Sequence, residues 1–117
     1  MKTFDLAAAP SVPVAVPASG IHAAILLDEG QAKLRRIELD AGGAIPPCRM
    51  SDDVVFVVLR GSVVVTAGPE KEQIAAPGAA YIPGGATSRS LRALEPSLIL
   101  AVLCKGARAY DPPPANA

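Results

Sequence analysis

Two sulfur-containing side chains, those of Cys48 and Met50, stand two residues apart and just before the acidic pair Asp52–Asp53. In an extended strand, residues i and i+2 point to the same face, so the thiol and the thioether could together hold a soft metal ion such as Cu(I). Two candidate ligands without a third are weak support for a metal site, and buried Cys and Met side chains more often fill apolar space. The adjacent carboxylates would point to opposite faces and are typical of a solvated turn.

A second group of polar side chains is formed by Tyr81, Ser88, Arg89 and Arg92. Arginines hold anions through charge-assisted hydrogen bonds, so Arg89 and Arg92 are candidates for an anionic ligand, although such arginines are more often exposed and salt-bridged. Tyr81 could offer its hydroxyl to a ligand or simply pack. Ser88 has no evident His or Asp partner, so a nucleophilic triad is not indicated.

The remaining candidates favour structural roles. His22 is the single histidine and stands among aliphatic residues, which indicates a structural or interface position rather than a catalytic base. Cys104 follows a long apolar run, which predicts a buried and unreactive thiol. Nothing in the spacing of the two cysteines points to a disulfide framework, so we expect a reduced, cytoplasmic protein.

Composition limits the class of protein further. The 117 residues suit one domain, half of them are apolar, and eleven basic residues balance eleven acidic ones. A neutral balance argues against nucleic acid or an anionic membrane as the main partner. No apolar run approaches the length of a membrane span, and Asp5 and the early prolines argue against a secretory signal.

Short apolar segments separated by Gly and Pro turns predict an all-β domain, a sandwich or barrel. Strands are expected over residues 21–27, 32–40, 54–59, 62–66, 73–75, 79–82, 88–94 and 97–104, with a polar loop over 67–72. Residues 1–20 form a proline-punctuated N-terminal arm, residues 21–104 the barrel domain, and residues 105–117 a flexible C-terminal tail.

Two strands carry more specific expectations. In residues 32–40 the apolar alternation changes phase after Arg36, and a bulge at Arg35–Arg36 would bring all four apolar residues to one face and leave a charged outer face. Residues 54–59 are apolar without alternation, which predicts a strand covered on both faces. The second cover could be another sheet, the arm or a second subunit, and the excess of apolar faces favours a homodimer.

The stretch from Gly42 to Gly61 has the glycine spacing of the first motif of the cupin superfamily, which the chain resembles over roughly residues 20–104. Pro83 and Gly85 fit the second motif, with a looser match at its leading glycine, Gly78. The resemblance implies a small, single-domain jelly-roll barrel (a double-stranded β-helix, RmlC-like).

The resemblance also implies an inward-facing metal site of three histidines and one glutamate. These positions are occupied here by Cys48, Met50, Val54 and Ser88, and the position of a further motif asparagine by Arg92. The motifs are therefore degenerate, and we expect no metal and no cofactor. The candidate pocket residues are Cys48, Met50, Val54, Phe56, Tyr81, Ser88, Arg89 and Arg92.

Three hypotheses for function follow. The first is a metal-free binding module for a small, mainly apolar molecule. The second is an enzyme that uses Cys48 or a soft metal. The third is a structural or interaction subunit without a ligand. A cavity with Arg89 or Arg92 pointing inward would favour the first hypothesis, whereas an interior filled by Met50, Val54 and Phe56 would favour the third.

Overall fold

The computed structural model describes residues 1–7, 12–13, 20–85 and 88–105. All of its regular elements are strands, and they run as follows: β1 (Val12–Pro13), β2 (Ile21–Glu29), β3 (Ala32–Leu39), β4 (Ala44–Cys48), β5 (Asp53–Arg60), β6 (Ser62–Ala67), β7 (Glu70–Ala75), β8 (Gly78–Ile82), β9 (Arg89–Ala93) and β10 (Ser97–Cys104). The predicted C-terminal tail lies outside the described residues apart from Lys105. Within these residues no helix is long and apolar enough to span a bilayer.

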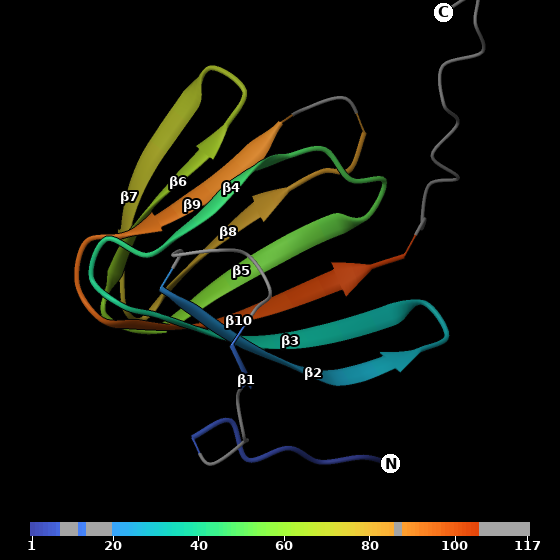
Figure 1. Cartoon of the computed structure of the whole chain (residues 1–117). Coiled ribbons are helices and arrows are strands. Elements are labelled where there is room, and N and C mark those ends of the chain that lie inside the picture. Colours follow the sequence, from blue (N-terminus) through green and yellow to red (C-terminus); the bar gives the residue numbers. More distant parts are fainter. Residues whose placement is uncertain (8–11, 14–19, 86–87, 106–117) are drawn as a thin grey trace, which may run out of the picture.

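The strands form two antiparallel sheets that face each other as two layers (Figure 1). One sheet has six strands in the order β1-β2-β3-β10-β5-β8, and the other has four in the order β4-β9-β6-β7. From β4 to β10 the chain changes layer at every connection except the β6–β7 hairpin, which is the pattern of a jelly roll. The predicted all-β jelly roll is confirmed.

The core lies between the two sheets and is built by simple alternation along each strand. In β5, Val54, Phe56 and Val58 are buried in the core, while the residues between them face outward and are only half-buried. Within the single chain the outer face of this strand is only half covered, so the predicted cover by a second subunit stays a prediction. Its inner face is fully covered, and its outer face retains exposed aliphatic surface.

The bulge predicted in β3 is absent. β3 pairs with β10 in unbroken register from Ala32 to Leu39, and the irregularity lies in β2 instead, between Ile25 and Leu27. Without a bulge, Arg35 shares the inner face with the core residues Ile37 and Leu39. Arg36 therefore lies on the outer face, so β3 carries a charged residue on each of its two faces.

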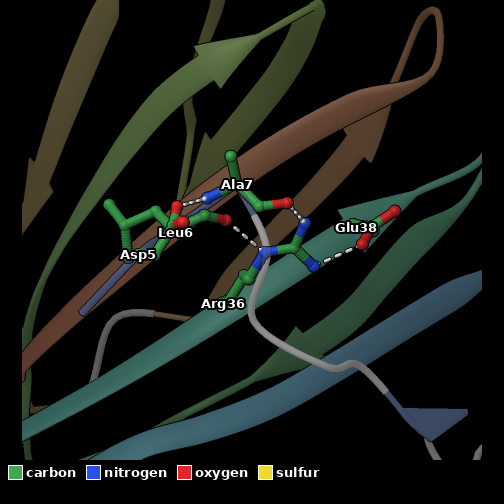
Figure 2. A network of polar contacts seen from close by, with 5 residues as sticks. All are labelled: Asp5, Leu6, Ala7, Arg36 and Glu38. Carbon is green, nitrogen blue, oxygen red and sulfur yellow. Dashed lines mark hydrogen bonds and ion pairs between the residues drawn. The ribbon is translucent and has the colours of Figure 1, made fainter.

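The N-terminal arm covers the outer side of β3 through Arg36 (Figure 2). The guanidinium group donates from Nε to the backbone oxygen of Leu6 at 2.5 Å and from Nη2 to that of Ala7 at 3.5 Å, and Nη1 pairs with Glu38. Arg36 is only 3% exposed as a result. The arm also supplies β1, which pairs with β2.

Both edges of the four-stranded sheet carry residues that suit an edge. β4 contains Pro46 and Pro47, which cannot donate to a ladder and are tolerated at an edge with an irregular register. β7 is wholly polar over Glu70–Gln73, because this edge strand is exposed. The loop predicted over residues 67–72 is consequently reduced to a turn at Gly68–Pro69, and the strand after it begins at Glu70.

Candidate functional site

A cavity of about 80 Å³ lies between the two sheets, at the end of the barrel where the β4–β5 and β8–β9 loops meet. The six-stranded sheet contributes inward-facing residues of β3, β5 and β10, and the four-stranded sheet contributes residues of β4 and β9. Most of the wall is apolar. The lining residues are Arg35, Ile37, Ile45, Cys48, Met50, Val54, Phe56, Arg89, Ser90, Ala101 and Leu103.

The glycine loop after β8 is hydrogen-bonded to the corner before β5, which includes the cavity residue Met50. The amide of Gly84 donates to Oδ1 of Asp53 at 2.7 Å, and the amide of Gly85 donates to the backbone oxygen of Met50 at 2.9 Å. A Cβ at Gly84 would stand 2.0 Å from the backbone oxygen of Ser51, so only glycine fits this approach. The two loops therefore hold each other in place.

Arg89 is the most buried charged residue of the cavity wall, with 3% of its surface exposed. It occupies the inward-facing first position of β9 and pairs across the sheet with Cys48. Its Nη1 donates to the backbone oxygen of Asp52 at 2.8 Å. Its Nη2 is also buried, but it has no hydrogen-bond partner among the described residues.

Arg35 reaches the same cavity from β3 in the opposite sheet. Its Nε is buried and likewise lacks a hydrogen-bond partner in the described part of the chain. Burial lowers the pKa of Arg89, and the nearby positive charge of Arg35 lowers that pKa further, while Cys48, Asp52 and Asp53 raise it. An arginine stays protonated throughout, so the cavity wall carries two positive charges.

This environment does not fit the metal ion that the resemblance implies. No three His, Cys, Asp or Glu side chains come together as a ligand set within the described residues. Val54 cannot ligate, and the two guanidinium groups would repel a cation beside Cys48 and Met50. The soft-metal site considered from the sequence is therefore unfavourable on electrostatic grounds.

Five of the residues proposed from the sequence line the cavity: Cys48, Met50, Val54, Phe56 and Arg89. The other three lie elsewhere. Tyr81 is 56% exposed and borders a shallow groove beside β7, and Arg92 is exposed on the outer face of β9. Ser88 precedes β9 and is not part of the cavity wall.

Several wall residues were not proposed from the sequence, Arg35 above all. The assumed bulge at Arg35–Arg36 assigned its side chain to the outer face. Alternation counted back from Leu39 through Ile37 would have placed it inside. Ile45, Ala101 and Leu103 are ordinary apolar residues, and nothing in the sequence distinguishes them from the rest of the core.

The two residues assigned structural roles lie outside the cavity. His22 is half-buried in β2, with Nε2 at 3.9 Å from Oδ2 of Asp40. Cys104 ends β10 and is exposed, contrary to the expectation of a buried thiol, because the strand leaves the core at its last residue. Both cysteines are free thiols.

Comparison with known proteins supports the architecture through structure alone. No family model and no curated protein matches the sequence. Among solved structures, KdgF from Halomonas sp. matches with a TM-score of 0.77 and 22% identity, over 88% of this chain and 94% of that one. The cupin domain of Cnp3 from Schizosaccharomyces pombe matches with a TM-score of 0.76 and 16% identity, over 88% and 73% of the two chains.

An RmlC-like cupin from Shewanella frigidimarina also matches, with a TM-score of 0.70 and 12% identity, over 80% of this chain and 84% of that one. At these low sequence identities, the structural similarity establishes the fold and nothing about activity. The chain therefore has the jelly-roll fold of RmlC-like cupins, as the glycine and proline motifs predicted. The positions at which the motif resemblance implied metal ligands carry Cys48, Met50, Val54 and Ser88.

Proposed function

We propose that this chain is a binding protein that holds a small molecule in the barrel cavity without a metal ion. The observation that supports this proposal is the cavity itself. Met50, Val54 and Phe56 line it but do not fill it, so space remains between the sheets at the end of the barrel. Concave, largely apolar sites with a few polar groups are the usual form of small-molecule sites.

The size of the cavity limits what it can hold. A dry cavity of about 150 Å³ in another protein accommodates benzene, so about 80 Å³ corresponds to roughly three or four non-hydrogen atoms by proportion. The ligand is therefore a very small molecule, or one whose end enters the cavity while the remainder lies at the mouth. The third hypothesis, a subunit without a ligand, is less well supported because the interior is not closed.

Blocking the cavity tests the proposal. Ala101 forms part of its wall and is 2% exposed, so Ala101→Val adds two carbon atoms directly into the space. We expect wild-type protein to bind members of a library of molecules with up to six non-hydrogen atoms, measured by ligand-observed NMR, and Ala101→Val to bind none of them. Elemental analysis of the same sample checks that no metal is required.

Ala79→Val on β8 is the matched control, because Ala79 is exposed and lies outside the cavity. It should bind as wild type does. Overpacking by Ala101→Val is expected to cost about 1–3 kcal/mol of stability, so its fold is verified by circular dichroism before binding is measured. Binding that survives Ala101→Val would place the ligand elsewhere and contradict the proposal.

An enzyme that uses Cys48 is the second candidate, and one observation favours it. The Cys48 thiol is exposed and also lines the cavity, so it would lie beside any bound molecule. Cys104 is also a free and exposed thiol but is not part of the cavity wall, which makes it an internal control. If Cys48 acts on the ligand, a cavity ligand should protect Cys48 but not Cys104 from alkylation, and Cys48→Ser should abolish turnover but not binding.

A further inference from the structure

The buried arginine Arg89 from β9 and the partly buried Arg35 from β3 face one small apolar cavity from opposite sheets. Each has a buried nitrogen without a hydrogen-bond partner among the described residues, Nε of Arg35 and Nη2 of Arg89. An unsatisfied buried donor is costly, and more so when it is charged. Such donors are normally satisfied, so their common position in a cavity wall points to a missing acceptor.

A negatively charged acceptor suits two guanidinium groups better than a neutral one, because charge-assisted hydrogen bonds are the stronger ones. The carboxylates near the site are engaged or directed elsewhere, since Oδ1 of Asp53 accepts from Gly84, and Asp52 meets Arg89 through its backbone oxygen. Burial lowers the pKa of Arg89 most, the positive charge of Arg35 lowers it to a smaller extent, and the Asp52 and Asp53 carboxylates oppose this lowering. An anion between them would relieve both the repulsion and the unsatisfied donors.

We propose that the ligand is a short-chain carboxylic acid whose carboxylate lies between Arg35 and Arg89. Its two oxygens would accept from Nε of Arg35 and Nη2 of Arg89, and its aliphatic end would contact the apolar wall formed by Ile37, Phe56 and Leu103. This inference rests on the proposed function and specifies its ligand. The site that holds a cation in the resembled motif would thus hold an anion here.

The cavity favours a carboxylate over an inorganic oxyanion. A phosphate dianion presents more acceptor oxygens than the two free donors can satisfy, and it has no apolar part to contact the remaining wall. A carboxylate has two oxygens in one plane, which suits one donor from each side. Acetate and propionate have four and five non-hydrogen atoms, close to what the volume allows.

The test compares propionate with propionamide, its neutral isostere, by isothermal titration or by NMR of the arginine side chains. We expect propionate to bind at least about tenfold more tightly than propionamide, because only the anion forms charge-assisted bonds to both arginines. Arg35→Met should weaken propionate binding at least about tenfold and leave propionamide binding little changed. Arg89→Met should do the same if it folds.

Arg92→Met is the matched control, since Arg92 lies on the same strand as Arg89 but is exposed on its outer face. It should leave propionate binding unchanged. Equal binding of propionate and propionamide would overturn the anion inference while leaving the proposed binding function intact. Tighter binding of inorganic phosphate than of propionate would also overturn it. Failure of the folded wild-type protein to bind any small molecule in the cavity would overturn both.

Discussion

Arg89 illustrates how one residue can serve both the fold and the site. Its Nη1 donates to the backbone oxygen of Asp52 and so holds the corner, whereas its Nη2 is buried without a hydrogen-bond partner among the described residues. The corner in turn depends on the close approach of Gly84 to Ser51. Contacts at single residues therefore hold the corner next to the cavity and orient the guanidinium group of Arg89.

Gly84→Ala tests this dependence. The added methyl group would stand 2.0 Å from the backbone oxygen of Ser51, so the loop must shift. We expect a loss of about 1–3 kcal/mol in the free energy of unfolding. We also expect changed NMR signals for the Arg89 side chain, because its acceptor at Asp52 moves with the corner.

Gly30→Ala provides the comparison for Gly84→Ala. Gly30 has φ +57° in the β2–β3 turn with no atom within 4 Å of an added Cβ, so it brings backbone strain without a clash. It should lower the stability but leave the Arg89 signals unchanged. If Gly84→Ala leaves those signals unchanged as well, the proposed link between the loop and Arg89 is incorrect.

At the scale of elements, the register of β3 decides which arginine serves which face. Regular alternation sends Arg35 into the cavity and Arg36 to the outer face, where the N-terminal segment covers it. β3 is thus fastened on both sides: to the barrel interior by its inner residues and to the N-terminal arm by Arg36 (Figure 2). The N-terminal arm is therefore attached to the barrel at Arg36.

Arg36→Gln should release the N-terminal segment. The shorter side chain cannot donate to the backbone oxygens of both Leu6 and Ala7, and it removes the charge that pairs with Glu38. We expect faster hydrogen exchange over residues 1–7 and a loss of about 1–3 kcal/mol in stability. Exchange measured by mass spectrometry resolves the segment directly.

Arg60→Gln is the control for this prediction, because Arg60 is exposed at the end of β5. It should alter neither the exchange of residues 1–7 nor the stability by more than about 0.5 kcal/mol. Unchanged protection of residues 1–7 in Arg36→Gln would show that other contacts hold the arm.

At the scale of the whole molecule, the two sheets differ in their outer faces. The register brings aliphatic side chains of β3, β5 and β10 side by side on the outer face of the six-stranded sheet. This outer patch is half-buried in the single chain and consists of Leu34, Val55, Val57, Leu100 and Val102. The homodimer expected from the sequence remains a prediction, and we propose that this patch forms its interface.

Val102→Lys tests the dimer. We expect the wild-type chain to sediment as a dimer at micromolar concentration and the variant to sediment as a monomer, because a lysine charge buried in an apolar interface is unfavourable. Val64→Lys is the matched control, since Val64 is a half-buried valine on the outer face of the other sheet. A monomeric wild-type protein, or dissociation by both substitutions, would contradict the assignment.

The architecture could be predicted from the sequence because strands and turns depend on residues that are close together in the chain. Apolar residues at period two, interrupted by Gly and Pro, can form only short strands in a small barrel. Seven of the eight predicted strands agree with the observed elements to within two residues at each end, and the eighth, β7, begins three residues earlier than predicted. β1 and β4 were not predicted as strands. β7 was predicted too short because an exposed edge strand needs no apolar residues.

The candidate site depends on strand register and on the packing of the two sheets, which short sequence patterns do not specify. The positions of Cys48, Met50 and Val54 follow from motif spacing. The inward direction of Arg35 follows from the unbroken register of β3, because the irregularity in strand pairing lies in β2 instead. Arg35 and Arg89 are 54 positions apart in sequence numbering, and only the packing of one sheet on the other brings their charges to one cavity. The strands could be predicted because the alternation of apolar and polar residues is a local property of the chain. The charge of the cavity could not, because it depends on which faces of the two sheets pack against each other.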